Sequence, residues 1–580
     1  MADHAYDLVV RNGSVADGTG APAREADIAI KGDTIVAVGK VSGRGREEID
    51  ARAKLVTPGF VDVHTHYDGQ ATWDERMQPS SWHGVTTVVM GNCGVGFAPC
   101  RAQDHDRLVR LMEGVEDIPF PVLSQGLPWN WESYPDYLDA LSQRRFDMDV
   151  GSQLPHAALR VYVMGERGVN REPATPDDIA QMATIAEAAV KAGAMGFSTS
   201  RTLNHRDSEG RPTPTLTAEE DELVGIALGL KAAGAGALQF VSDFTDAEEE
   251  FALMRAMVRK SGRPLSFSLL QGHAAPDKWR LLLDHTAEAN AQGLAIRAQV
   301  AGRPVGVLLG LELTMNPFSK NPVYREIAAL PLSERVARLR DPDFRARLLA
   351  TPPIVEPGFA RSTLQNWSNM FRMDDDFDYE PLQSDSLQAT ADRQGADPQA
   401  LALDAMLEND GRGILYVPFL NYANFTLDPA REMLMDAHSV PGLSDGGAHV
   451  GMICDGSFPT YNLAHWTRGR KRGERIALEK MVAMQTADTA ALIGLHDRGR
   501  IAPGLRADLN VIDYARLRLK PPTVAYDLPA GGKRLLQRAE GYEATIVAGA
   551  VTYRDGEPTG ALPGRLLRGG KAAPQAIAAE

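Results

Sequence analysis

The chain has 580 residues with a hydrophobic fraction of 44%, and its 61 Lys and Arg against 76 Asp and Glu give a net charge of −15. This acidic balance argues against a nucleic-acid-binding protein, whose surface is usually basic. Three cysteines cannot form a disulfide framework, and no apolar run reaches the roughly 18 residues of a membrane span. We therefore expect a soluble cytoplasmic protein whose partner is a small molecule, with no nucleic-acid or membrane partner.

Both ends of the chain are rich in short strands. Residues 7–15 predict two strands joined by a turn at Asn12-Gly13, and residues 26–38 repeat the pattern around Gly32-Asp33. Strand-like runs return at 507–513 and 544–553. We predict a small β-sandwich assembled from both ends, residues 1–57 and 491–580.

The middle of the chain, residues 58–490, alternates apolar runs with helical stretches, which is typical of parallel βα units. One helix is predicted over 175–192, starting at Thr175, and another from a capping box that begins at Thr217. Eight such units predict a (β/α)8 TIM barrel. The eight predicted strands are Leu55–His66, Thr86–Asn92, Ala157–Met164, Ala194–Ser200, Ala237–Ser242, Leu265–Gln271, Leu294–Val300 and Ser439–Asp445.

Residues 303–437 are too many for one crossover between strands. They contain helical pieces, many prolines and an acidic run at 374–380. Insertions that follow barrel strands fall on the active-site face, so we expect this segment at the mouth of the barrel. It is either a substrate lid or a solvated surface elaboration.

The first predicted barrel strand ends in His64-Thr-His66. Residues two apart on a strand face the same side, so both imidazoles are expected to point into the barrel, with Asp62 behind them. Two converging imidazoles suit a transition metal such as zinc. The last predicted strand ends at Asp445, which in a barrel lies beside the first strand. A carboxylate there can bind the metal and accept a proton.

Three segments of the sequence carry a resemblance to a known family: Pro58–Gln70, Gly84–Gly94 and Ala194–Ser200. They resemble the D-aminoacylase (N-acyl-D-amino-acid deacylase) branch of the amidohydrolase superfamily. Residues 497–513 are similar to the C-terminal return strand of that superfamily, and Asn92-Cys93-Gly94 points to the branch.

The resemblance implies a metal-dependent hydrolase that contains zinc, as one or two ions. It implies that His64 and His66 bind metal, that Cys93 is a ligand in place of a carboxylated lysine, and that Asp445 is a ligand or the general acid/base. Independently, Cys93 follows a predicted strand and precedes a glycine, where a thiolate can reach a metal. The expected reaction is cleavage of an N-acyl amino acid by metal-activated water, with Asp445 moving the proton.

The sequence departs from the branch at two further metal positions. The branch places one histidine at the end of strand five and another at the end of strand six, and this chain has neither. Asp243 and His273 lie nearby and are candidate substitutes, but each is equally well explained as a loop residue.

A second departure concerns the substrate carboxylate, which the branch reads with an arginine shortly after the catalytic aspartate. This chain has His449 in that region and no arginine. Arginines near strand ends can pair with a carboxylate through two hydrogen bonds. The candidates for substrate contact are Arg201, Arg297, Arg303, His205 and His449.

These departures leave two alternatives to an N-acyl amino acid deacylase. One is a hydrolase of a cyclic amide or a xenobiotic amide. The other, from a different class, is a catalytically inactive barrel that binds a small molecule. The sequence is compatible with a homo-oligomer but selects none.

Overall fold

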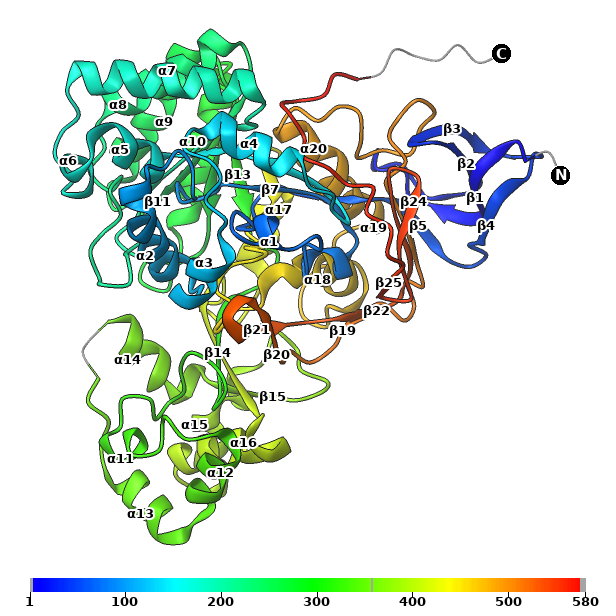
Figure 1. The fold of residues 1–580 in the computed structure, drawn as a ribbon. Coiled ribbons are helices and arrows are strands. Elements are labelled where there is room, and N and C mark those ends of the chain that lie inside the picture. Colours follow the sequence, from blue (N-terminus) through cyan, green and yellow to red (C-terminus); the bar gives the residue numbers. More distant parts are fainter. Residues whose placement is uncertain (1–3, 356–357, 574–580) are drawn as a thin grey trace.

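The computed structural model describes residues 4–355 and 358–573. Figure 1 shows strands from both chain ends gathered at one side, a helix-rich middle, and a separate lobe in green and yellow-green. The protein is therefore of mixed α/β class. Within the described ranges, no helix has both the length and the apolar character needed to cross a membrane.

Strands from the two ends of the chain form one nine-stranded sheet in the order β25-β24-β23-β18-β5-β1-β2-β3, with β4 paired to β1. The ends join where β5 and β18 pair antiparallel, with Leu55 opposite Ile512. Apolar residues from both ends share one buried cluster. The strands are β1 (Tyr6–Val15), β2 (Arg24–Lys31), β3 (Thr34–Gly39), β4 (Gly45–Asp50), β5 (Leu55–Pro58), β18 (Leu509–Ile512), β23 (Tyr542–Val547), β24 (Ala550–Arg554) and β25 (Glu557–Pro558).

One of the two predicted turns in this region is wrong. The Gly32-Asp33 turn does separate β2 from β3. At Asn12-Gly13, however, β1 continues through a β-bulge, where its register with β2 shifts. Asn12 has a φ of 57°, a conformation that suits a bulge as well as a hairpin turn. The local sequence therefore could not distinguish the two.

The middle of the chain forms two parallel sheets, one of three strands (β6-β7-β8) and one of six (β9-β10-β11-β12-β13-β17). A single residue, Gln153, separates β8 from β9, and a parallel bridge joins Thr65 after β6 to Gly446 after β17. The strands are β6 (Phe60–Asp62), β7 (Val85–Met90), β8 (Asp149–Ser152), β9 (Leu154–Pro155), β10 (Gly196–Arg201), β11 (Ala237–Ser242), β12 (Leu265–Leu269), β13 (Ile296–Val300) and β17 (Ser439–Pro441).

The prediction of the third parallel strand is wrong. Residues predicted as the strand Ala157–Met164 lie in helix α5 (His156–Met164), and the strand position is taken by β8 and β9. An apolar run buried on several sides fits a helix as well as a strand. The true strand carries a buried charge, because Asp149 is bound by Arg498 at 2.7 Å and by Arg506 at 2.9 Å.

Helices connect most of the parallel strands. The helix predicted from Thr175 is present as α7 (Pro176–Ala192), with Thr175 in its capping box. The capping box predicted at Thr217 does not form, because that hydroxyl donates to the backbone oxygen of Arg171 and α8 begins at Glu220. The other connecting helices are α8 (Glu220–Ala233), α9 (Ala247–Ser261), α10 (Lys278–Ala291) and α17 (Asp428–Met435).

The segment predicted as an insertion forms the separate lobe in Figure 1, with an apolar core of its own. It is anchored beside the end of β12, where the backbone N–H of Asn421 donates to the carbonyl of Gln271 at 2.9 Å. A role as a substrate lid stays a prediction. The lobe contains the antiparallel strands β14 (Val305–Leu309), β16 (Ile414–Leu420) and β15 (Phe371–Met373), and the helices α11 (Pro322–Arg325), α12 (Leu332–Arg340), α13 (Pro342–Ala350), α14 (Phe359–Leu364), α15 (Leu387–Gln394) and α16 (Pro398–Gly411).

Candidate functional site

The histidine pair lies just past the C-terminal end of β6. The backbone N–H of His66 donates to the carbonyl of Gly446 at 2.8 Å, and that of Asp445 donates to the carbonyl of His64 at 3.2 Å. These bonds tie the end of the first parallel strand to the loop that follows the last one. Asp62 holds this segment from behind, since it accepts the backbone N–H of His64 at 3.2 Å and the hydroxyl of Ser444.

Cys93 lies three residues past the end of β7, with a φ of 56°. Gly91 lets the chain turn here, because a Cβ at that position would lie 2.1 Å from the carbonyl oxygen of Gln153. The side chain of Asn92 donates to the carbonyl of Thr65 at 3.2 Å, which links this turn to the histidine pair. The result is that Cys93 Sγ lies 3.3 Å from His64 Nε2.

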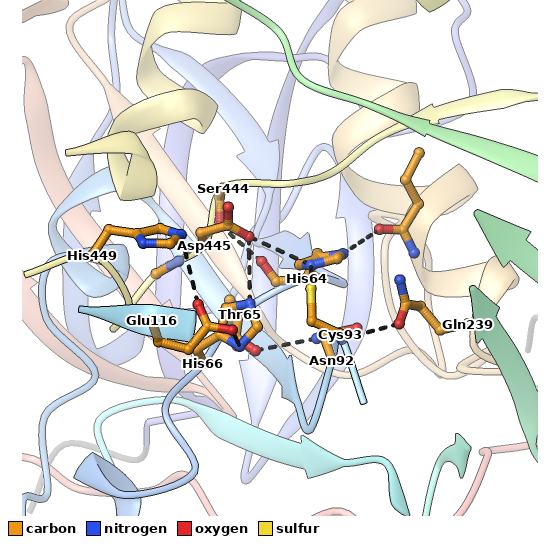
Figure 2. Close-up of polar contacts among 12 residues, drawn as sticks. His64, Thr65, His66, Asn92, Cys93, Glu116, Gln239, Ser444, Asp445 and His449 are labelled. Atoms are coloured by element: carbon orange, nitrogen blue, oxygen red, sulfur yellow. Dashed lines mark hydrogen bonds and ion pairs between the residues drawn. The ribbon is translucent and has the colours of Figure 1, made fainter. Parts of the chain in front are cut away.

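Asp445 completes the group from the loop after β17. Its Oδ1 lies 3.4 Å from His64 Nε2 and 3.5 Å from His66 Nε2, and Figure 2 shows the carboxylate above both rings. The histidine side chains are 1% exposed, whereas that of Asp445 is 23% exposed. Asp445 is therefore the member of the group that a molecule entering from solvent can reach.

Glu116, at the C-terminal end of α2 (His105–Glu116), holds the far side of His66. Its Oε1 lies 3.2 Å from His66 Nδ1, and its Oε2 lies 3.6 Å from His449 Nε2. The first contact is a close ionic approach without the alignment of a good hydrogen bond. An acceptor beside Nδ1 favours a proton on that nitrogen, so Nε2, the nitrogen that faces Asp445, is the one available to bind a metal.

Burial dominates the titration of this group. It raises the pKa of Cys93 to about 12, raises that of Glu116 to about 7, and lowers that of His64 to about 4. Burial would also raise the pKa of Asp445, but the approach of His66 and of His64 to this carboxylate outweighs burial and holds that pKa below its usual range. Asp445 is thus a carboxylate at neutral pH, ready to accept a proton.

These donors fit a zinc ion. The ligand atoms of His64, His66 and Cys93 all lie within 4.8 Å of one another, and Asp445 Oδ1 is buried without a hydrogen-bond partner. Two imidazoles, a thiol and a carboxylate are the groups that zinc prefers. A bound cation would also stabilise the thiolate, whose pKa burial otherwise raises.

The other predicted ligands have different partners. Asp243 accepts the Thr202 hydroxyl at 2.5 Å and the backbone N–H of Leu203 at 2.8 Å, and His273 is exposed. The structure therefore gives no support to either as a ligand of this group.

The predicted substrate contacts divide into two sets. Half-buried His205 lies close enough to the group for the charges of His66 and His449 to lower its pKa further, to about 3, after the larger effect of burial. The arginines are otherwise engaged. Arg201 forms an ion pair with Glu250 at 2.9 Å, Arg297 donates to the carbonyl of Ala437 near the N-terminal end of β17, and buried Arg303 pairs with Asp455 at 2.8 Å.

Three buried residues in contact with the group were missed by the sequence analysis: Glu116, Gln239 and Gln299. The backbone N–H of Cys93 donates to Gln239, and His64 bonds to Gln299. Both glutamines lie on predicted apolar strands, where a polar side chain was the available signal. Glu116 ends an ordinary amphipathic helix, and nothing in its local sequence marks it.

A model of the amidohydrolase family matches residues 47–553, most of the chain. The chain belongs to the amidohydrolase family. This confirms the predicted resemblance and, with it, the predicted class of enzyme, a metal-dependent hydrolase of C–N bonds other than peptide bonds.

Individual relatives point to the predicted branch. This amidohydrolase is 26% identical to the D-aminoacylase of Alcaligenes xylosoxydans xylosoxydans over 568 residues, which cover 97% of each chain. Two solved structures are similar in fold. A D-aminoacylase described with a binuclear metal centre gives a TM-score of 0.65 at 23% identity, over 97% of this chain and all of that one. The second is an N-acyl-D-glutamate deacylase from Bordetella bronchiseptica, complexed with zinc and a phosphonate inhibitor. It gives a TM-score of 0.64 at 22% identity, over 97% of this chain and 99% of that one.

Proposed function

We propose that this amidohydrolase cleaves the amide bond of an N-acyl amino acid, as a zinc-dependent, D-aminoacylase-like deacylase. The observation that carries the proposal is the meeting of His64, His66, Cys93 and Asp445, which come from three loops far apart in the sequence. The full-length similarity to a D-aminoacylase supports the substrate class.

We further propose that the parallel strands close into a (β/α)8 barrel with the site at its C-terminal mouth. The support is the strand order of the two sheets, the single residue between β8 and β9, and the bridge between Thr65 and Gly446. Counting β8 and β9 as one strand gives eight. In this arrangement residues 1–57 and 491–580 are the accessory β-domain, residues 58–490 are the catalytic barrel, and residues 303–437 are its insertion.

His64, His66, Cys93 and Asp445 would hold the zinc ion. Once bound, zinc would supply Lewis-acid activation of water and of the amide carbonyl. The three buried donors would match the number of protein ligands in catalytic zinc sites, and Asp445 would add a carboxylate from the solvent side.

Asp445 is the residue that moves the proton. Its Oδ1 is turned toward the histidines, which leaves Oδ2 to accept a proton from the attacking water and return it to the leaving nitrogen. Its lowered pKa favours the ionised form that this role requires. Glu116 and the histidine rings keep the floor of the site fixed, so that this carboxylate is its exposed part.

The test is an activity screen of zinc-loaded protein against N-acetyl-D-amino acids and their L enantiomers. We expect hydrolysis of D substrates, loss of activity after chelation and recovery with added zinc. Protein with verified zinc that cleaves no N-acyl amino acid would overturn the proposed substrate class.

A second candidate is hydrolysis of a cyclic or xenobiotic amide without a free carboxylate. It is favoured by one observation: Arg201, Arg297 and Arg303, the arginines predicted to read a carboxylate, are all bound to other partners. Cyclic imides and aryl amides in the same screen distinguish this candidate. An inactive small-molecule-binding barrel would instead be supported by protein that retains no zinc.

A further inference from the structure

The side of the site formed by β11, β12 and β13 carries neutral polar groups. Gln239 on β11 pairs in register with Ser266 on β12, and Gln299 lies on β13. The two glutamines are each 1% exposed and Ser266 is 5% exposed. A buried amide side chain has four hydrogen-bonding positions, so the groups that it bonds to indicate its role.

Gln299 determines which ring nitrogen of His64 carries the proton. Its Nε2 donates to Ser266 Oγ at 2.9 Å, and its Oε1 lies 2.7 Å from His64 Nδ1. The amide oxygen can only accept, so His64 must donate from Nδ1. The lone pair of His64 then lies on Nε2, the atom that faces Cys93 and Asp445.

Gln239 fixes the backbone at Cys93. Its Oε1 accepts the backbone N–H of Cys93 at 3.1 Å, at a residue whose φ of 56° is unfavourable outside glycine. Figure 2 shows Gln239 reaching this turn from the side opposite Asp445. The bond holds the turn in the conformation that brings Sγ beside His64.

We propose that Gln239 and Gln299 are positioning residues for a single metal ion, and that strands β11 to β13 contribute no ligands for a second. The inference rests on the metal centre of the proposed function. It differs from the binuclear centre described for the similar D-aminoacylase. In the part of the chain that the structure describes, His64, His66 and Cys93 are the one group of three or more clustered candidate ligands.

Charge balance supports one ion. Two neutral imidazoles, one thiolate and one carboxylate carry two negative charges, which a single divalent cation neutralises. Buried Glu116 is a further carboxylate in contact with this group, and even with it ionised a second divalent cation would leave one positive charge in a buried site, at a large desolvation cost. The amides cannot offset that charge, and their oxygens are already bonded to Cys93 and His64.

The first experiment counts metal. Protein loaded with excess zinc and desalted is expected to retain one ion per chain by elemental analysis and to show one class of site by calorimetry. With cobalt, we expect a thiolate-to-metal charge-transfer band from Cys93. Two tightly bound ions would overturn the inference.

The second experiment removes the amide acceptors. Gln299→Met and Gln239→Met should each weaken metal affinity by roughly 10- to 100-fold, the usual cost of losing a residue that orients a ligand. Gln299→Glu keeps the acceptor and should restore the affinity. Gln239→Met should also alter the cobalt charge-transfer band. The matched control is Gln537→Met, a buried glutamine that bonds to Tyr379 and Lys520 instead.

The possible results distinguish the positioning role of the glutamines from the proposed function. If Gln299→Met binds metal as tightly as the native protein, or loses no more than Gln537→Met, the positioning role is wrong and the proposed function survives. If native protein binds no metal, both fail. Melting curves for each variant identify one that fails to fold, and the Gln299→Glu comparison then decides between lost positioning and lost packing.

Discussion

The two sides of the site are built differently. On the β6, β7 and β17 side, the chemical groups lie on loops, and Cys93 and Asp445 both have positive φ angles, of 56° and 47°. On the β11 to β13 side, Gln239 and Gln299 lie within regular strands. Positive φ at such residues costs about 1–3 kcal/mol each and persists only where the surroundings fix it. Within the site, the strained backbone therefore lies at residues that face the reaction, while regular strands hold them in place.

We call the side formed by the loops after β6, β7 and β17 the strained side, and the side formed by β11 to β13 the regular side. The largest effect on catalysis is expected from Asp445→Asn on the strained side. It removes the proton acceptor with little change in shape, so kcat should fall by roughly 10²- to 10⁴-fold in zinc-loaded protein. The matched control is Asp243→Asn at the end of β11, which should keep its activity because Thr202 and Leu203 bind that carboxylate. Near-native kcat in Asp445→Asn, with zinc confirmed, would remove Asp445 from the mechanism.

Cys93→Ser tests whether the thiolate on the strained turn is a metal ligand. A hydroxyl is a much weaker ligand than a thiolate, so zinc affinity should fall by at least the roughly 10- to 100-fold expected for a supporting residue. Competition with a chelator of known affinity measures the change. Cys100→Ser is the control, because that buried thiol bonds to the carbonyl of Arg101 and lies outside the group of His64, His66 and Cys93. Equal affinities in the two variants would show that Cys93 is not a ligand.

The site residues on the strained side could be predicted from the sequence, and those on the regular side could not. Strand parity predicted that His64 and His66 face one way, and the order of strands predicted that Asp445 lies beside them. The contacts agree with both expectations, but the predicted strand ends are wrong, because the histidines lie past the end of β6 and Asp445 lies past the end of β17. Gln239 and Gln299 depend on hydrogen bonds across 146 and 235 residues, which no local pattern reveals. The position of Glu116 beside His66 has the same cause.

The errors in predicting the fold also have a physical origin. β8 was missed because the buried charge of Asp149 is compensated by Arg498 and Arg506, from the other end of the chain. Such a strand does not look apolar in sequence. Arg201 was predicted to contact substrate, yet its partner Glu250 lies on the next connecting helix. In each case the deciding interaction is between charges distant in sequence.

Glu380 lies away from both sides of the site, so its replacement shows how a change in stability alone affects the protein. Burial would raise its pKa, but bonds from His465 and Arg470 outweigh burial and lower the pKa from 4.5 to about 2. A depressed pKa means that this stabilisation is complete above pH 4.5 and is lost as the pH falls toward 2. Glu380→Gln should therefore cost about 3 kcal/mol at neutral pH and progressively less in acid.

Urea unfolding of native protein and Glu380→Gln, at pH 7 and at pH 3, measures this difference. The gap between their midpoints should narrow at pH 3, and kcat/KM at pH 7 should be unchanged. A gap of equal size at both values would mean that the lost stability comes from packing and not from charge. Against this baseline, a loss of kcat in Asp445→Asn without a matching loss of stability is assigned to the site.

The smallest effect on catalysis is expected from Arg201→Met, at the end of β10. Its guanidinium makes three hydrogen bonds to Glu250, two at 3.0 Å and one at 2.9 Å, and a fourth to the carbonyl of Ala218. Losing these should cost about 1–3 kcal/mol of stability and leave KM unchanged. If Arg201 bound the substrate carboxylate, its replacement would instead raise KM by roughly tenfold or more. If KM rises in Arg201→Met but not in Glu250→Gln, the arginine leaves its ion pair to bind the substrate, and β10, the strand paired with β11, takes part in substrate recognition.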